Sequence, residues 1–232
     1  MNHLRSDRVF ESLVQALNDA KTLKEYRKPH DTYVCHWLPR ALASLLVYGG
    51  TLLYGKDPTY LKFRAVEVIA RIPYHSWQGV RFLLLTLFYR DERRALKLAE
   101  MAEFARIAQD NETMHVVVIS SLARQEEYEY WLRDTFAPLC FAAFYFATSF
   151  FMYLFKPRWS FELNYLFEQH AFDQYQRFLE QRQAALKQKA VTSAYLTWYG
   201  RKPKNQYEFF LSVRNDEIIH RNDSIEAIRA IK

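Results

Sequence analysis

Two short motifs combine a carboxylate and an imidazole at the same spacing. Asn111-Glu112-Thr113-Met114-His115 and Asp216-Glu217-Ile218-Ile219-His220 each contain Glu-x-x-His within a stretch of helical character. A separation of three residues puts both side chains on one helix face, where they can bind one metal ion. One such motif would carry little weight in a chain with 7 His, and two are only moderately improbable by chance, so the rest of the chain has to support a metal site.

Two further glutamates stand in segments that are otherwise apolar. Glu67 lies within Ala65-Val66-Glu67-Val68-Ile69-Ala70, and Glu168 follows Tyr165-Leu166-Phe167. A carboxylate on a buried face must be paired, protonated or bound to a metal. The resulting order, Glu, Glu-x-x-His, Glu, Glu-x-x-His on four helices, is typical of di-iron and di-manganese carboxylate bundles. Two divalent cations would neutralise the four carboxylates and permit their burial together.

Alternative assignments account for fewer of these residues. Surface glutamates with incidental histidine neighbours would explain either motif alone more readily than the whole set. A zinc protease is excluded because the chain has no His-Glu-x-x-His, and a zinc finger because it has only 2 Cys.

The hydrophobic spacing predicts the helices that must position these residues. The chain has 5 Gly and 7 Pro in 232 residues, without internal repeats or strand-like alternation of useful length. We predict an all-α, ferritin-like four-helix di-iron bundle with two additional apolar helices forming a membrane-facing surface. Residues 1–35 are expected to form a polar N-terminal extension and residues 36–232 the bundle domain. The predicted helices cover residues 37–54, 61–87, 91–132, 135–155, 161–189 and 205–231.

The two additional helices, residues 37–54 and 135–155, are strongly apolar. The second carries no charge and is long enough to span a bilayer. Spanning would put Glu112 and His115 on one side of the membrane and Glu168, Glu217 and His220 on the other, so they could not share metal ions. We therefore expect both helices to lie in one leaflet, and their burial in a dimer interface is the alternative.

The composition agrees with a membrane partner. The chain is 50% hydrophobic and 17% aromatic, and this content excludes a disordered chain. Its formal net charge of +6 suits an anionic surface. Charge alone does not separate membrane headgroups from nucleic acid. The apolar helices favour the membrane, and no nucleic-acid partner is expected. Residues 1–32 match neither a secretory signal nor a transit peptide, so we expect the protein to be made where it works.

At these motifs the chain resembles the alternative oxidase family, the membrane-bound di-iron quinol oxidases of mitochondria, plastids and bacteria. Residues 111–115 are similar to the family's Asn-Glu-Arg-Met-His, and residues 214–221 to its Arg-Ala-Asp-Glu-x-x-His-Arg. Residues 66–73 resemble Leu-Glu-Thr/Ser-x-Ala-x-Val-Pro, and residues 168–175 resemble the third pattern, an acidic run followed by Ala and then Tyr. The resemblance extends over residues 37–228.

The resemblance implies a cofactor, two iron ions, and roles for individual residues. Tyr175 would lie beside the irons and supply an electron when O2 is cleaved. Asn111 and Asp216 would hold the histidines by hydrogen bonds. The iron ligands would be Glu67, Glu112, His115, Glu168, Glu217 and His220.

The expected quinone pocket departs from the family pattern. Lys62 stands where the family has Arg, with Arg64 close by as a substitute, and Gln174 replaces a Thr. The family's three consecutive Glu correspond to Glu168-Gln169-His170. The expected pocket residues are Lys62, Arg64, His170, Ala171 and Gln174.

The implied function is a quinol oxidase that reduces O2 to water without pumping protons. The resemblance places it, as a homodimer, on the inner face of a respiratory membrane. The pocket departures favour an alternative, a di-iron oxygenase or hydroxylase acting on a lipophilic substrate. A ferritin-like iron store is a third reading, which the apolar helices disfavour. Iron and manganese are not distinguished by these residues.

Overall fold

The computed structural model describes residues 8–231, except for the side chains of residues 100–104, and every regular element in that part is a helix. The predicted all-α class is therefore confirmed. Residues 1–7 of the expected N-terminal extension and residue 232 lie outside the described residues. The helices are α1 (Arg8–Ala16), α2 (Ala20–Arg27), α3 (Trp37–Tyr54), α4 (Tyr60–Ala70), α5 (Ile72–Phe88), α6 (Glu92–Glu126), η1 (Leu132–Phe136), α7 (Ala137–Phe155), α8 (Pro157–Gln188), α9 (Ala194–Tyr199) and α10 (Gln206–Ala230).

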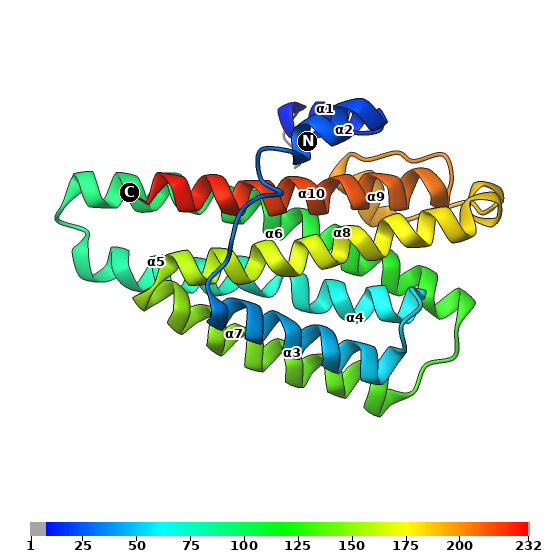
Figure 1. Ribbon diagram of the computed structural model, residues 1–232, viewed down its shortest axis with the longest axis horizontal. Helices are drawn as coiled ribbons and strands as arrows, with labels where there is room; N and C mark the ends of the chain where they lie inside the picture. Colours follow the sequence, from blue (N-terminus) through cyan, green and yellow to red (C-terminus); the bar gives the residue numbers. More distant parts are fainter. Residues whose placement is uncertain (1–7, 232) are drawn as a thin grey trace.

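A bundle of long helices forms the centre of the molecule (Figure 1). α8 and α10 make the most extensive helix pair, and α4 and α5 follow one another along α6. The predicted helix over residues 61–87 is broken at Arg71. Pro73 has no backbone N–H to donate, so it stands in the first turn of a new helix, where that donor is not needed.

The predicted helix over residues 91–132 ends earlier, at Glu126. The next side chain, Glu127, turns back to the start of α4, where its carboxylate accepts hydrogen bonds from the backbone N–H groups of Tyr60 at 2.9 Å and Leu61 at 3.4 Å. A carboxylate at this position satisfies free donors and interacts favourably with the helix dipole. Capping of α4 thus accompanies the end of α6.

α3 and α7 form a layer along one side of the bundle (Figure 1). α7 runs lengthwise against α5 and α8 and does not project away from them. It belongs to the one stretch in the described part of the chain, Leu132–Phe155, that is long and apolar enough to cross a membrane, and only 33% of its most apolar window is buried. Large exposed apolar side chains of this layer are Trp37, Leu45, Tyr48, Leu52, Leu139, Phe144, Phe146, Phe151 and Phe155.

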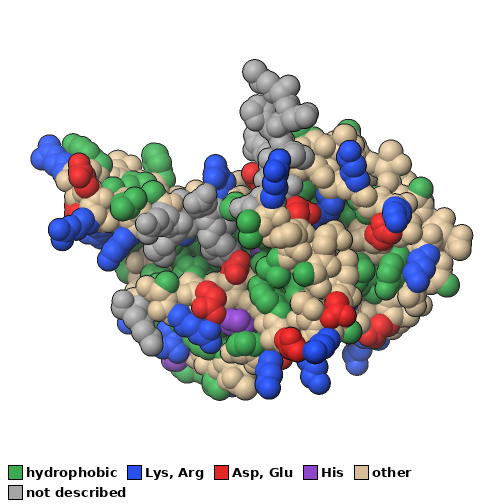
Figure 2. Space-filling model, turned by 90° about the horizontal axis from the view of Figure 1, so that it is seen from above, with side chains coloured by type: hydrophobic (Ala, Val, Ile, Leu, Met, Phe, Trp, Pro, Cys, Tyr) green, Lys and Arg blue, Asp and Glu red, His purple; other side chains and the backbone are tan. Residues whose placement is uncertain are grey.

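α1 and α2 lie on the opposite side of the bundle, over α10 (Figure 1). The sequence analysis did not predict these helices. α2 is short and mostly polar, and α1 is short, although apolar residues in it and directly after it, at positions 9, 10, 13, 14 and 17, recur at helical spacing. Val14 and Leu17 are nevertheless fully buried in a cluster with Phe172, Ile218 and Ile219. Figure 2 looks onto this side, where charged side chains of both signs are scattered among apolar ones.

Candidate metal centre

The structure brings the six predicted ligand residues together inside the bundle. Each side chain is at most 1% exposed, and they come from four helices, α4, α6, α8 and α10. Their donor atoms form two groups, within each of which the atoms lie at most 4.8 Å apart. Because Glu112 belongs to both groups, the groups adjoin as two metal ions sharing a carboxylate would require. The first group is Glu67, Glu112, His115 and Glu217, and the second is Glu112, Glu168 and His220.

Many of these donor atoms have no hydrogen-bond partner. Both carboxylate oxygens of Glu112 and Glu217 and both ring nitrogens of His220 are buried in this condition. The Nδ1 atom of His220 lies 2.7 Å from Oε1 of Glu112 without hydrogen-bond geometry. Buried polar atoms are normally satisfied, so converging atoms without partners are suited to bind a cation. Carboxylate oxygens and imidazole nitrogens are suitable ligands for iron and manganese, so the residues fit a pair of such ions.

The electrostatics of the cluster point to the same need for positive charge. Burial, together with the neighbouring Glu112, raises the pKa of Glu67 to about 8 and that of Glu168 to about 7. The same causes raise the pKa of Glu217 well above its usual value. Without bound cations Glu67 and Glu217 are therefore mostly protonated at neutral pH, and Glu168 is about half protonated. Metal ions would replace those protons and allow all four groups to ionise.

His115 links the cluster to a second layer of buried charges. Its Nε2 atom lies 2.8 Å from Oδ2 of Asp216, and the Nη1 atom of Arg201 donates to the same oxygen at 2.5 Å. Asn111 donates to Asp216 at 3.2 Å, so it reaches His115 only through that carboxylate. Arg201 is itself held by Glu11 of α1, through a 2.6 Å contact. The arrangement orients the imidazole, as partners of metal-binding histidines generally do.

Two tyrosines touch the cluster from opposite directions. Tyr175, seven residues after Glu168, donates a hydrogen bond to Glu67. Tyr74, seven residues after Glu67, donates to Glu168 at 2.8 Å. Along the chain the pairs are Glu67 with Tyr74 and Glu168 with Tyr175. In space each fully buried phenol binds the glutamate of the other pair. Burial raises the pKa of both phenols, so both are protonated donors at neutral pH.

The sequence motifs did not single out Tyr74 or Arg201. The spacing of seven residues from Glu67 was available as a signal for Tyr74, although the helix break at Arg71 obscures it. Arg201 lies in a basic loop between α9 and α10, and nothing in its neighbourhood along the chain points to Asp216. Its role depends on how the loop folds back on α10.

The expected pocket residues divide into two sets. Lys62 and His170 line a narrow cavity between α3, α4, α7 and α8 whose wall is mostly apolar. Arg64 points elsewhere, donating to Glu129 at 2.5 Å and to the carbonyl of Asp134 at 2.9 Å. Ala171 and Gln174 do not line the cavity. Its volume of about 40 Å³ is near the space of a single water molecule, so a larger ligand requires the walls to move apart.

The fold and the buried cluster define a carboxylate-rich metal-binding helical bundle. Within that class the chain belongs to the alternative oxidase family, whose model matches residues 16–227, and the resemblance seen in the motifs is confirmed. The family is one of di-iron proteins. The chain is also similar to ubiquinol oxidase 4, chloroplastic/chromoplastic, of Arabidopsis thaliana. The two are 26% identical over 185 residues, which cover 71% of this chain, and the chain spans 50% of that relative's length.

Proposed function

We propose that the protein is a quinol oxidase in which two quinols reduce one O2 to two water molecules, giving two quinones, with no proton pumping. The observation that carries this proposal is the pair of adjoining donor groups that share Glu112 inside the bundle. Membership of the alternative oxidase family and the similarity to a ubiquinol oxidase support it.

Two iron ions are the proposed cofactor, held by Glu67, Glu112, His115, Glu168, Glu217 and His220. Bound there, iron would take electrons from the quinol and pass them to O2. The protein itself supplies a buried site that excludes water, since all six side chains are at most 1% exposed. Asp216 and Arg201 keep the imidazole of His115 in place.

Tyr175 is the proposed source of a further electron and proton during O2 cleavage. Oxidation of two ferrous ions to ferric ions would supply two of the four electrons that full reduction requires. The nearby phenol can supply a third, and the second quinol would supply the fourth and restore the phenol. Its hydroxyl contacts Glu67, and its ring stacks on Phe63 with a centroid distance of 4.1 Å. This position holds the hydroxyl against the cluster.

The narrow cavity beside Lys62 and His170 is the proposed entry for the quinol head. It lies between the layer of α3 and α7 and two of the ligand helices, α4 and α8. Apolar walls suit the ring, and His170 can hydrogen-bond to one of its oxygens. The ammonium of Lys62 donates to the carbonyls of Gly55 at 2.9 Å and Lys56 at 3.2 Å, which leaves one further donor for the ligand. A donor dissolved in the lipid could then reach the cluster from the side that carries the exposed aromatic and aliphatic residues.

The proposed location is a single leaflet on the inner face of a respiratory membrane, with α3 and α7 immersed in it. The exposed apolar residues of these helices support this placement. A homodimer is also proposed. α5 carries Phe82 and Leu87, 74% and 61% exposed, outside the layer of α3 and α7, and these residues suit contact with a second copy.

The test is oxygen uptake by membranes containing the protein, with a short-chain ubiquinol supplied and cyanide present to silence haem oxidases. We expect uptake with two quinols consumed per O2, and none from Glu112→Ala, which removes the carboxylate shared by both donor groups. Iron-loaded protein that consumes no O2 with quinol would contradict the proposal.

A di-iron hydroxylase of a lipophilic substrate is the second candidate. The departures from the family pattern at Lys62, His170 and Gln174 favour it. Isotopically labelled O2 separates the two functions, because an oxidase transfers the label to water and a hydroxylase leaves one labelled atom in the organic product.

A further inference from the structure

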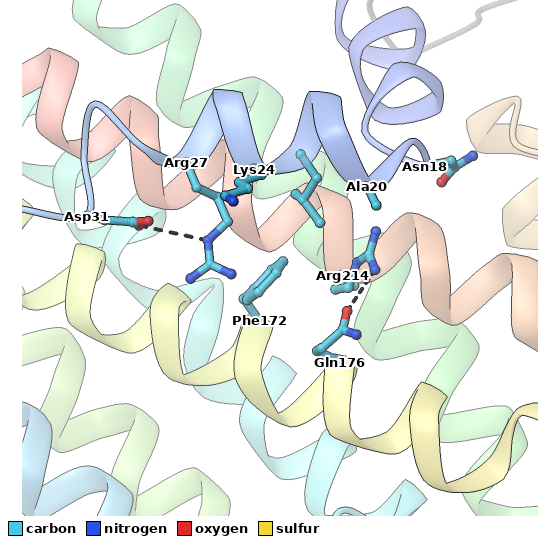
Figure 3. A pocket seen from close by; sticks show the side chains of 9 residues that line it. Asn18, Ala20, Lys24, Arg27, Asp31, Phe172, Gln176 and Arg214 are labelled. Carbon is cyan, nitrogen blue, oxygen red and sulfur yellow. Dashed lines mark hydrogen bonds and ion pairs between the residues drawn. The ribbon is translucent and has the colours of Figure 1, made fainter.

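A second cavity lies on the side of the molecule away from α3 and α7, where α2 covers α8 and α10 (Figure 3). Its volume is about 510 Å³, within the range of small-molecule sites. Part of its wall is apolar and part is formed by amide and charged side chains. The lining residues are Asn18, Ala20, Leu23, Lys24, Arg27, Asp31, Phe172, Gln176 and Arg214.

The charges that line this cavity are unbalanced. Lys24, Arg27 and Arg214 are cationic, and the one carboxylate of the lining is that of Asp31. This carboxylate lies 2.7 Å from Nη1 of Arg221, outside the cavity, and 3.8 Å from Nε of Arg27. Because the closer partner of Asp31 is Arg221, little of its charge remains for the lining cations.

Arg214 is a buried guanidinium without a carboxylate partner among the described residues. It is 7% exposed, and its hydrogen bonds go to neutral oxygens of Asn215, Gln176 and Leu17. Burial lowers its pKa to about 10. Arg27 acts in the same direction, whereas Tyr207 and the carboxylate of Glu180, which is not within ion-pair distance, act in the opposite direction. Burying a charge is costly unless an opposite charge compensates it.

Arg27 meets Arg214 at the ring of Phe172. Their guanidinium carbons lie 4.6 Å and 5.8 Å from the ring centroid, and the two groups flank the ring in Figure 3. The Nε atom of Arg27 is buried without a hydrogen-bond partner. Two like charges beside one open cavity, one with an unused donor, form a site that an anion would complete.

We propose that this cavity binds a small organic dianion, a phosphate monoester or a dicarboxylate, whose two negative charges are shared by Arg27 and Arg214. Lys24 adds positive charge from α2, and Phe172 and Leu23 provide apolar contact for a short carbon skeleton. The cavity is larger than a bare oxyanion needs, which favours an organic ligand. A lipid headgroup is disfavoured because the cavity faces away from α3 and α7.

Such a ligand would fasten α2 to the two helices beneath it. Phe172 lies one turn after Glu168 on α8, and Arg214 lies one turn before Glu217 on α10. The dianion would therefore join the N-terminal helices to two of the four helices that carry the metal cluster, α8 and α10. Binding at this cavity does not depend on the proposed oxidase activity.

The experiment measures binding to the full-length, metal-loaded protein by titration calorimetry, with glycerol 3-phosphate and succinate as dianions and acetate as a monoanion. We expect saturable binding of at least one dianion, weakened by added NaCl, and at least about tenfold weaker binding of acetate. Binding of only glycerol 3-phosphate or only succinate assigns the ligand to phosphate esters or to dicarboxylates. Hydrogen exchange of the α2 amides should slow when the dianion binds.

Matched variants complete the test. Arg27→Gln should weaken dianion binding about tenfold or more, whereas Lys28→Gln, which removes the same charge from the exposed end of α2, should not. If Arg214→Gln fails to fold, Arg27→Gln and Lys24→Gln still decide the question, since both residues are more exposed. The proposal is overturned if no dianion binds, if Arg27→Gln binds like Lys28→Gln, or if inorganic phosphate binds as tightly as the organic dianions.

Discussion

At the scale of single residues, the crossed pairs of glutamate and tyrosine are the most informative feature of the site. Tyr175 holds Glu67, and Tyr74 holds Glu168. Tyr74 is supported further by Asn164, which donates to its hydroxyl at 3.1 Å. The two phenols are alike in burial, spacing and partner, so each serves as the control for the other.

We predict different outcomes for the two matched variants Tyr175→Phe and Tyr74→Phe. Each removes only a hydroxyl that contacts a candidate ligand, so each should weaken metal binding by about tenfold. At saturating iron, both should bind two ions per chain. O2 reduction should then fall about a hundredfold or more in Tyr175→Phe, and much less in Tyr74→Phe, because only Tyr175 supplies an electron. Equal turnover in the two variants would assign Tyr175 a positioning role alone.

The raised carboxyl pKa values predict how pH affects the metal-free protein. Glu67 and Glu168, with pKa values of about 8 and about 7, take up protons on folding, since both values exceed those of the unfolded chain. The stability that these protonated groups contribute declines as pH rises from the carboxyl pKa of the unfolded chain, about 4.3, and is fully lost above the folded values of about 7 and about 8. His115 acts in the same direction: burial lowers its pKa, but Glu112 and Glu67 more than reverse this.

The melting temperature of metal-free protein should therefore fall between about pH 5 and pH 8, and that of metal-loaded protein should change little, because the cations have replaced the protons. Differential scanning calorimetry of both forms across this range is the measurement. Parallel curves for the two forms would show that the cluster does not hold the metal.

At the scale of the elements, α3 approaches α7 closely at one glycine. A Cβ atom at Gly49 would lie 2.7 Å from a ring atom of Phe141, whereas a Cβ at Gly50 would meet nothing within 4 Å. The Gly-Gly pair interrupts an apolar run in the sequence, yet only its first member is required by this contact. The second is a helical glycine without a packing reason among the described residues.

Gly49→Ala and Gly50→Ala should accordingly change stability in opposite directions. Gly50→Ala should raise the free energy of unfolding by up to about 1 kcal/mol, because alanine favours the helix. Gly49→Ala should lower it by about 1 kcal/mol or more, since the methyl group displaces Phe141. Denaturant unfolding of both variants and of the unaltered protein, all in one detergent, measures the two free energies of unfolding. If Gly49→Ala is the more stable variant, α3 and α7 do not pack as described.

At the scale of the whole molecule, the two sides of the bundle differ in character. One carries the layer of α3 and α7 with its exposed apolar residues, and the other carries α1, α2 and the cavity beneath α2. The metal cluster lies between them. A lipophilic donor and a water-soluble anion would thus approach the same ligand helices from opposite sides.

Membrane attachment through this layer predicts the behaviour of the protein on extraction. Detergent should release it from membranes and high salt should not, because burial of apolar area provides most of the affinity and is not screened by ions. Replacing the exposed aromatic residues Phe151 and Phe155 by Ser should increase release by salt. Complete extraction of the unaltered protein by salt would contradict membrane attachment and indicate that α3 and α7 form a protein interface.

The sequence alone determined the helical class and selected the six residues that the bundle brings together. It could do so because helix periodicity and the Glu-x-x-His spacing are local properties, and because Glu67 and Glu168 in apolar runs are conspicuous without any contact being known. It did not predict α1 and α2, whose burial depends on Phe172, Ile218 and Ile219 far along the chain. Only the tertiary structure decided that Arg201 holds Asp216, that Tyr74 holds Glu168, and that Arg64 turns away from the narrow cavity. Each of these depends on how distant segments meet, and no local pattern encodes that.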